Sequence, residues 1–307
     1  MPTKLWLDTD IGTDVDDVVA LSLALLSPEV YLIGVSTVYG DVGLRSRMVL
    51  KMLSLASRQD VPVFSGCERP LLNERPIYWA GWEGEGLLGP EDAGLAPRPE
   101  HAADAMIRAV SENEGEVVLC AIGPQSNVGL AFMKEPSLAR KVRLLLLMGG
   151  VARCCPNALD MPLAEHNIKC DPEAASVVFR SGAPIVMVGL DATLQVRITA
   201  AGVAAIRAVG DPLRSALAGQ IERYLNAAGR DFTYMHDPLA LAYALRPELL
   251  RLEPCEVQVD TRSEIAAGAT WARRNPSGKT QVAVGVDVAG FEQLLLERLS
   301  GPPLSRP

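Results

Sequence analysis

Short apolar runs, bounded by turn residues, recur along the chain and predict buried β-strands. Most of these runs are continuous rather than alternating, which indicates strands that are covered on both faces. The predicted strands are Leu5–Leu7, Tyr31–Val38, Val117–Ile122, Arg143–Met148, Ile185–Leu190, Glu256–Asp260 and Thr280–Val286.

Segments with helical periodicity lie between these runs. The predicted helices are Val18–Leu26, Leu44–Ala56, His101–Glu112, Val128–Met133 and Asp171–Phe179, and the region Ala200–Arg246 is largely helical in pattern. Alternating strands and helices favour an α/β fold with a mostly parallel sheet flanked by helices. Because no linker, repeat or low-complexity tract interrupts the pattern, we expect one domain over residues 1–299 and a tail over 300–307.

Glycine, aspartate and asparagine residues gather directly after the predicted strands. The segments concerned are 8–17, 39–41, 123–127, 149–150 and 191–193. Ligands of open parallel sheets bind beyond the carboxyl ends of the strands. One such segment could be a simple turn, but five segments at the same edge of a sheet favour one shared site.

The segment after the first strand, DTDIGTDVDD at residues 8–17, is rich in aspartate. Crowded carboxylates repel one another unless a cation or solvent relieves the repulsion. The donors are oxygens only, which selects Ca²⁺ or Mg²⁺ rather than zinc. An EF-hand needs glycine and glutamate where Thr13 and Val19 stand, so that motif is excluded. The alternative is that Asp14, Asp16 and Asp17 only cap the next helix.

Composition narrows the classes of partner. Hydrophobic residues make up 49% of the 307 residues and charged residues 21%, which permits a sizeable core. The net charge of −8, without a long Lys/Arg run, argues against a nucleic-acid polymer as partner. The apolar stretches are too short to span a bilayer, no signal peptide is recognisable, and the six cysteines lack metal or redox spacing. We therefore expect a cytoplasmic protein with no membrane partner.

The acidic segment resembles the amino-terminal signature of the nucleoside hydrolases, in a variant with a longer stretch between the glycine and the paired aspartates. Further segments that resemble the family follow in order at 122–127, 148–150, 164–167, 171–175 and 236–240, so the matches span nearly the whole chain. The resemblance implies a single Rossmann-like α/β domain that forms a homodimer or homotetramer. It also implies hydrolysis of the N-glycosidic bond of ribonucleosides to free base and ribose.

The resemblance further implies roles for individual residues. Calcium would be bound by the carboxylates of Asp10, Asp17 and Asp237 and by the main-chain carbonyl of Ile122. Asp10 would also take a proton from the attacking water that the calcium holds. His236 would face the leaving base, where a side chain that donates near neutral pH is useful. The ribose hydroxyls would be bound by Asp16, Asn157, Glu165 and Asn167, with Asp8 behind the ligands.

Three positions depart from the family's usual pattern. Asp41 stands where asparagine is usual, and its carboxylate would alter contacts to the ribose or its 5′ group. His166 stands where phenylalanine is usual. Trp82 lies where many members carry a His-Gly pair, and it could stack on the nucleobase or only pack a loop. Stacking by Trp82 would favour purines, but the sequence leaves purine or pyrimidine preference open.

Other interpretations account for parts of the pattern. Residues 84–89 fit G-x-G-x-x-G but lack the strand before and the helix after that a dinucleotide site needs, so a lid is favoured. A haloacid-dehalogenase-like phosphatase also begins with a strand and Asp-x-Asp, but it needs a later acidic pair that is not evident. A non-catalytic nucleoside- or ribose-binding protein of the same fold is the other alternative. Whether Asp14 or Asp16 contacts the ribose also stays open.

Overall fold

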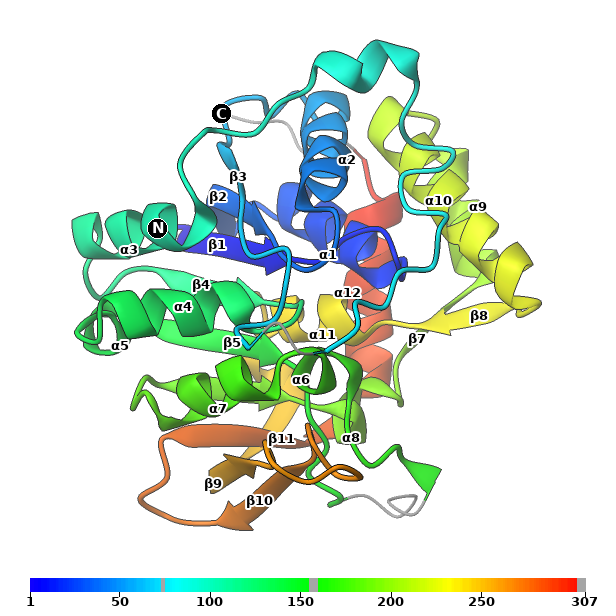
Figure 1. Ribbon diagram of the computed structural model, residues 1–307. Coiled ribbons are helices and arrows are strands. Elements are labelled where there is room, and N and C mark those ends of the chain that lie inside the picture. Colours follow the sequence, from blue (N-terminus) through cyan, green and yellow to red (C-terminus); the bar gives the residue numbers. More distant parts are fainter. Residues whose placement is uncertain (73–74, 155–159, 303–307) are drawn as a thin grey trace.

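A nine-stranded sheet forms the centre of the computed structural model, which describes residues 1–72, 75–154 and 160–302 (Figure 1). The order of the strands is β10-β9-β11-β6-β5-β4-β1-β2-β3. Their bounds are β1 Thr3–Thr9, β2 Val30–Thr37, β3 Val63–Ser65, β4 Val118–Ala121, β5 Leu144–Met148, β6 Ile185–Val188, β9 Leu250–Val259, β10 Thr270–Arg274 and β11 Thr280–Val286.

The predicted mostly parallel sheet is confirmed. From β3 through β6 to β11 every neighbouring pair is parallel, whereas β9 pairs antiparallel with both β10 and β11. The order β3-β2-β1-β4-β5-β6 reverses direction between β1 and β4. Loops diverge at such a reversal and leave a crevice beyond the carboxyl ends of the two strands. The acidic segment after β1 and the turn after β4 both start there.

Apolar side chains alternate along the central strands and build a core on each face of the sheet. In β5, Leu146 and Met148 belong to one cluster, while Leu145 and Leu147 belong to the other. The first cluster includes residues of α1 (Asp16–Leu25), α2 (Val42–Leu55), α9 (Ala200–Ala208), α10 (Pro212–Ala228), α11 (His236–Ala242) and α12 (Val288–Ser300). The second includes residues of α3 (Ala102–Glu112), α4 (Ser126–Lys134), α5 (Leu138–Lys141) and α7 (Pro172–Arg180). Strands covered on both faces explain the continuous apolar runs.

Some short elements differ from the prediction. The strands β3, β7 (Arg197–Thr199), β8 (Phe232–Tyr234) and β10 were not predicted, and β9 begins at Leu250 rather than Glu256. The region 200–246 is not helical throughout, because β8 pairs with β7 between two of its helices. Three-residue strands carry too little periodicity to be recognised. The remaining elements are α6 (His166–Cys170), α8 (Leu190–Thr193) and the 3₁₀ turns η1 (Pro90–Gly94) and η3 (Pro247–Leu249).

The carboxyl end of α12 is held by a buried arginine of α10. Arg214 is 2% exposed and donates to the main-chain oxygens of Leu299, at 2.7 Å, and Gly301, at 2.9 Å. Ser300 ends α12 and Gly301 is held by this contact, while residues 303–307 lie outside the described ranges; the division into a domain over 1–299 and a tail over 300–307 stays a prediction. Within the described ranges, no helix is long and apolar enough to cross a membrane.

Candidate functional site

A pocket of about 550 Å³ lies at the carboxyl edge of the sheet. Four neighbouring strands contribute residues to it. Asp10 lies directly after β1, Ile122 lies directly after β4, Met148 ends β5, and Leu190 lies just after β6. Of the five polar segments that were expected to share one site, only the segment at 8–17 lines this pocket; the other three strands contribute the apolar residues Ile122, Met148 and Leu190. Its walls also include Thr13, Asp14, Asp16, Asp17, Tyr78, Trp82, Pro162, Ala164, Glu165, His166, Asn167, Lys169, Tyr224, Ala227, Ala228, His236 and Asp237.

Three buried carboxylates converge at the floor of the pocket. Asp16 and Asp17 begin α1, Asp237 lies in the first turn of α11, and each offers an oxygen within 4.8 Å of the others. Asp17 accepts a short hydrogen bond from the Thr9 hydroxyl, and Asp16 accepts one from the main-chain nitrogen of Asp237, at 3.1 Å. Capping of α1 alone does not account for these two side chains, because both point towards another part of the chain.

Burial makes this carboxylate group electrostatically unfavourable. Desolvation, followed by repulsion from neighbouring aspartates, raises the pKa of Asp16, Asp17 and Asp237 well above the ordinary value. Burial also raises the pKa of Asp10, although the Arg45 guanidinium opposes that shift. Such a group of buried oxygen donors suits a hard divalent cation, which would offset the repulsion.

Asp10 lies beside this group and close to the turn after β4. A Cβ atom at Gly123 would lie 2.8 Å from Asp10 Oδ1, so only glycine permits this approach. Asp8 lies behind, where its Oδ1 accepts from Ser36, at 2.5 Å, and from Asn127, at 2.8 Å. Burial raises the pKa of Asp8 to about 7. Asp8 is buried and does not line the pocket, and its role behind the ligands stays a prediction.

Glu165 and Asn167 form the wall on the side of α6. The Glu165 carboxylate accepts from the main-chain nitrogens of Asn167, at 2.7 Å, and Gly150, at 2.9 Å. Asn167 donates to the carbonyl of Ile122, at 2.7 Å. These bonds join β4, the turn after β5 and α6 at the pocket floor. They fix the two side chains in place, and both residues line the pocket.

His236 also lines the pocket, at the start of α11 and directly before Asp237. Its Nδ1 lies 2.7 Å from the Thr193 hydroxyl, which fixes the ring. Burial lowers the pKa of His236, so the ring is neutral near pH 7. Tyr224 of α10 and the 40%-exposed Trp82 also line this pocket, and Trp82 Nε1 donates to the carbonyl of Thr13, at 3.1 Å.

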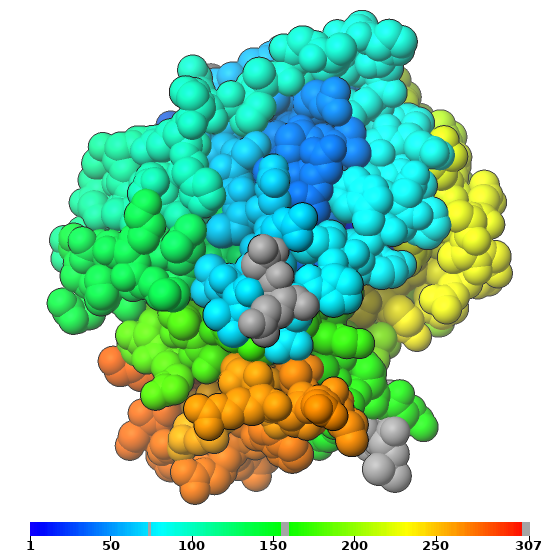
Figure 2. Space-filling view, in the orientation of Figure 1, coloured from blue at the N-terminus to red at the C-terminus, as the bar shows by residue number. Residues whose placement is uncertain are grey.

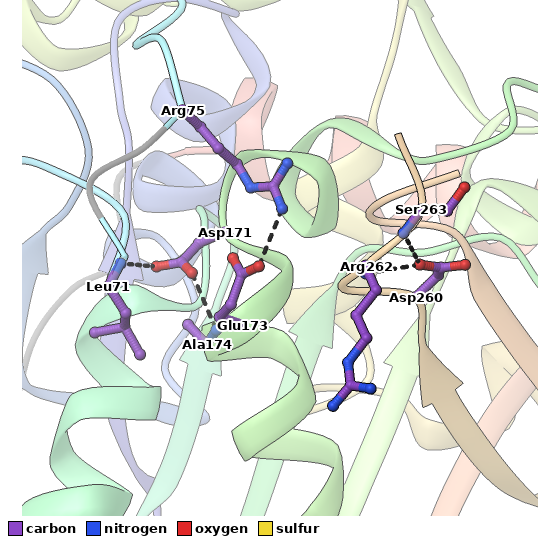
Figure 3. A network of polar contacts seen from close by, with 8 residues as sticks. All are labelled: Leu71, Arg75, Asp171, Glu173, Ala174, Asp260, Arg262 and Ser263. Atoms are coloured by element: carbon purple, nitrogen blue, oxygen red, sulfur yellow. Dashed lines mark hydrogen bonds and ion pairs between the residues drawn. The ribbon is translucent and has the colours of Figure 1, made fainter. Parts of the chain in front are cut away.

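The segment that carries Tyr78 and Trp82 crosses the face of the molecule as a cyan band (Figure 2). Its first part is fastened to α7, as Figure 3 shows. The main-chain nitrogen of Leu71 donates to Asp171, at 2.9 Å, and Arg75 forms a 3.0 Å ion pair with Glu173. Asp171 also accepts from the nitrogen of Ala174 and so caps α7. These contacts assign the 171–175 motif a structural role.

Some of the predicted site residues do not line the pocket. Asp41 caps α2 by accepting from the nitrogen of Leu44, at 2.8 Å, and it is not among the residues that line the pocket. Its expected ribose contact is therefore not supported. Asn157 lies outside the described residues. Of the predicted metal ligands, Asp17 and Asp237 belong to the compact carboxylate group together with Asp16. Asp10 and Ile122 line the same pocket, and the ligand set of Asp10, Asp17, Ile122 and Asp237 stays a prediction.

Several pocket residues were not predicted from the sequence. Tyr78, Lys169 and Tyr224 line the pocket, but none of them follows a predicted strand. Tyr224 lies inside the long helix α10, where an aromatic residue has no distinguishing signal. His166, which stands where the family usually has phenylalanine, lines the pocket and contacts Tyr78 edge to face, with ring centroids 5.7 Å apart.

Comparison with known proteins identifies the chain's relatives. Residues 5–293 match the family described as inosine-uridine preferring nucleoside hydrolase. The chain is 36% identical to the pyrimidine-specific ribonucleoside hydrolase RihA of Enterobacter sp. (strain 638), over 98% of each protein. Among solved structures, the plant nucleoside hydrolase PpNRh1 superposes with a TM-score of 0.87 at 31% identity, over 98% of this chain and 100% of that one.

A second solved structure gives a similar result. The purine-preferring ribonucleoside hydrolase from Gardnerella vaginalis superposes with a TM-score of 0.83 at 31% identity, covering 97% of this chain and 98% of that one. Matches of this extent leave the haloacid-dehalogenase-like alternative without support. The chain belongs to the inosine-uridine preferring nucleoside hydrolase family.

Proposed function

We propose that this nucleoside hydrolase cleaves the N-glycosidic bond of ribonucleosides in the pocket at the carboxyl edge of the sheet. The observation that carries the proposal is the convergence of buried carboxylates from α1 and α11 beside Asp10, Glu165 and Asn167. Cleavage of this bond builds positive charge on the sugar, as in other glycosidases. A pocket lined by carboxylates stabilises that charge.

We propose that a divalent cation completes the site. Asp16, Asp17 and Asp237 offer oxygens within 4.8 Å of one another, and burial and mutual repulsion raise the pKa of all three, which supports a counter-charge at this place. Asp10 and the carbonyl of Ile122 lie beside them in the pocket. When bound, the ion supplies Lewis acidity, which lowers the pKa of water. Calcium, rather than magnesium, is proposed from the resemblance of the acidic segment to the family signature.

The chain's own residues then perform the remaining tasks. Asp10 accepts a proton from the attacking water, because its carboxylate lies in the pocket, where burial raises its pKa above the ordinary value and makes it a stronger base. Asn167 and Glu165 bind ribose hydroxyls and orient the sugar, which favours ribose over sugars that lack a hydroxyl. His236 hydrogen-bonds the leaving base as a neutral N–H donor.

The base end of the pocket is proposed to contain Trp82, Tyr224 and His236. The relatives do not fix the preferred base, because RihA is described as pyrimidine-specific and the Gardnerella protein as purine-preferring. Stacking on Trp82 is possible for any nucleobase but is stronger for the larger purine rings, so we propose a purine preference. A homodimer or homotetramer and a single domain over residues 1–299 also remain proposals.

The Asp10→Asn variant tests the proposed chemistry. Loss of the base should lower kcat for inosine and uridine by about a thousandfold, while circular dichroism and thermal unfolding stay close to wild type. The exposed Asp231, which does not line the pocket, serves as the matched control, since Asp231→Asn makes the same chemical change. Ribose release by Asp10→Asn at the wild-type rate would refute the role of Asp10 and favour another base.

A further inference from the structure

Arg45 of α2 is a fully buried cation that holds the loop between β1 and α1. Its side chain is 0% exposed, and its Nε donates to the carbonyl of Tyr39, at 2.7 Å. One terminal nitrogen donates to the main-chain oxygens of Asp10 and Ile11, the latter at 2.7 Å. The other terminal nitrogen donates to the Thr13 hydroxyl, at 3.1 Å. The planar fork of the guanidinium therefore fixes three points of this loop at once.

Thr13 connects the loop that Arg45 holds to the segment that contains Trp82. Its hydroxyl donates to Glu83 Oε1, at 2.9 Å, and its carbonyl accepts from Trp82 Nε1, at 3.1 Å. Glu83 is 7% exposed, and its carboxylate also accepts from the main-chain nitrogens of Ala80 and Gly81, at 2.9 and 2.8 Å. Arg45, Thr13 and Glu83 thus form a continuous chain of hydrogen bonds with a charged group at each end, an arrangement stronger than isolated neutral bonds.

Trp79, which belongs to the same segment as Trp82, contacts Arg45 directly. The Arg45 guanidinium lies 5.0 Å from the centroid of the Trp79 ring, which favours a cation–π contact. The ring also covers Gly40, whose φ of +77° and missing Cβ allow the contact: a Cβ there would lie 2.6 Å from the ring. The Trp82 segment is therefore attached to α2 at one end and to the acidic loop at Thr13.

We propose that Arg45 and Thr13 are positioning residues that couple the acidic loop to the Trp82 segment. The guanidinium that holds the main chain at Asp10 thereby also sets the place of Trp82 at the pocket. Thr13 influences catalysis by fixing the position of Trp82, whereas Arg45 fixes the positions of both Asp10 and Trp82. The kinetic consequences of this coupling rest on the proposed function, because they require Trp82 to contact the leaving base.

The Thr13→Val variant removes the hydroxyl and keeps the branched side chain. Loss of this hydrogen bond should raise KM for purine ribonucleosides about fivefold and change kcat by less than about twofold. In a Trp82→Ala background the same substitution should have no further effect on KM, because its route of action is gone. Thr3→Val, at the amino end of β1, is the matched control and should leave both constants unchanged.

A readout without substrate separates this inference from the proposed function. Subtracting the fluorescence of each Trp82→Ala partner isolates the Trp82 signal, and acrylamide should quench that signal more strongly in Thr13→Val than in wild type. Arg45→Lys keeps the charge but loses the fork, so it should increase the quenching and also lower kcat.

Unchanged quenching of Trp82 in Thr13→Val would overturn the coupling, whatever the activity. An equal KM effect with and without Trp82 would also overturn it, because Thr13 would then act by another route. If the wild-type protein released no ribose, the proposed function would fail, and the quenching comparison would still decide the positioning role.

Discussion

Replacing Asp237 by asparagine should stabilise the metal-free protein while removing its response to calcium. Asp237 is buried, and its carboxylate lies within 4.8 Å of those of Asp16 and Asp17. Asparagine has nearly the same shape, carries no charge, and can donate its amide N–H to either neighbour. The substitution therefore relieves repulsion without opening a cavity, at the expense of a proposed metal ligand.

The expected magnitude follows from the geometry. Two carboxylates 4.8 Å apart repel by about 3.5 kcal/mol at an effective dielectric constant of about 20, and Asp237 takes part in two such pairs. Protonation of one carboxyl sets an upper limit on this repulsion. Keeping one carboxyl protonated at about pH 7.5 costs about 5 kcal/mol relative to the unfolded chain, in which the same carboxyl is ionised. If the substitution relieves about 3 kcal/mol of this cost, an unfolding entropy of about 2.1 cal/mol/K per residue over 307 residues gives a rise in Tm of about 5 °C.

Calorimetry with and without calcium measures both effects. Wild type should gain Tm when calcium replaces a chelator, whereas Asp237→Asn should begin higher and gain little. The raised pKa values also predict that metal-free wild type becomes more stable as pH falls from neutrality towards the unfolded pKa, and that this gain shrinks in the variant. Asp231→Asn controls for the chemical change. A lower metal-free Tm in Asp237→Asn, or a full calcium response, would refute the reasoning.

Three further predictions address single residues. Burial raises the pKa of Asp8 to about 7, so its contribution to stability is present below the unfolded pKa and is lost as pH rises through 7. Urea unfolding of the metal-free protein should therefore depend less on pH in Asp8→Asn, by about 2.5 kcal/mol between about pH 5 and 8. Trp82→Ala should raise KM for inosine more than for uridine, and an equal loss would remove the purine hypothesis. His236→Phe should lower kcat about a hundredfold for natural nucleosides but far less for a p-nitrophenyl riboside, whose leaving group needs no proton; equal losses would exclude a leaving-group role.

The central sheet and the position of the site were predictable because both depend on local signals. Buried strands leave continuous apolar runs, and the residues that follow them must meet at one edge of a parallel sheet. This reasoning placed Asp10 and Asp17 at that edge, and both line the pocket together with Asn167, which the family resemblance supplied. The family resemblance added Asp237 and His236, which no spacing rule connects to the acidic loop.

Other features depend on tertiary contacts that leave no pattern in the sequence. Asp41 has the same chemistry as a ribose ligand and as a helix cap, and only the structure shows that it caps α2. Arg45 looks like one more charged residue on a helix, yet it is fully buried against main-chain oxygens. Tyr224 reaches the pocket from the middle of α10, and short strands such as β8 have too few residues to show a period. The cytoplasmic location stays a prediction of the sequence.

Release of free ribose from a panel of purine and pyrimidine ribonucleosides, with calcium and with a calcium chelator, tests the central claim most directly. The account predicts ribose release that the chelator abolishes and added calcium restores, with the fastest substrate defining the base preference. Release that persists at full rate in the chelator would contradict the proposed cation site. No release from any nucleoside, in protein that calorimetry shows to bind calcium, would contradict the proposed hydrolysis and favour a non-catalytic nucleoside-binding protein.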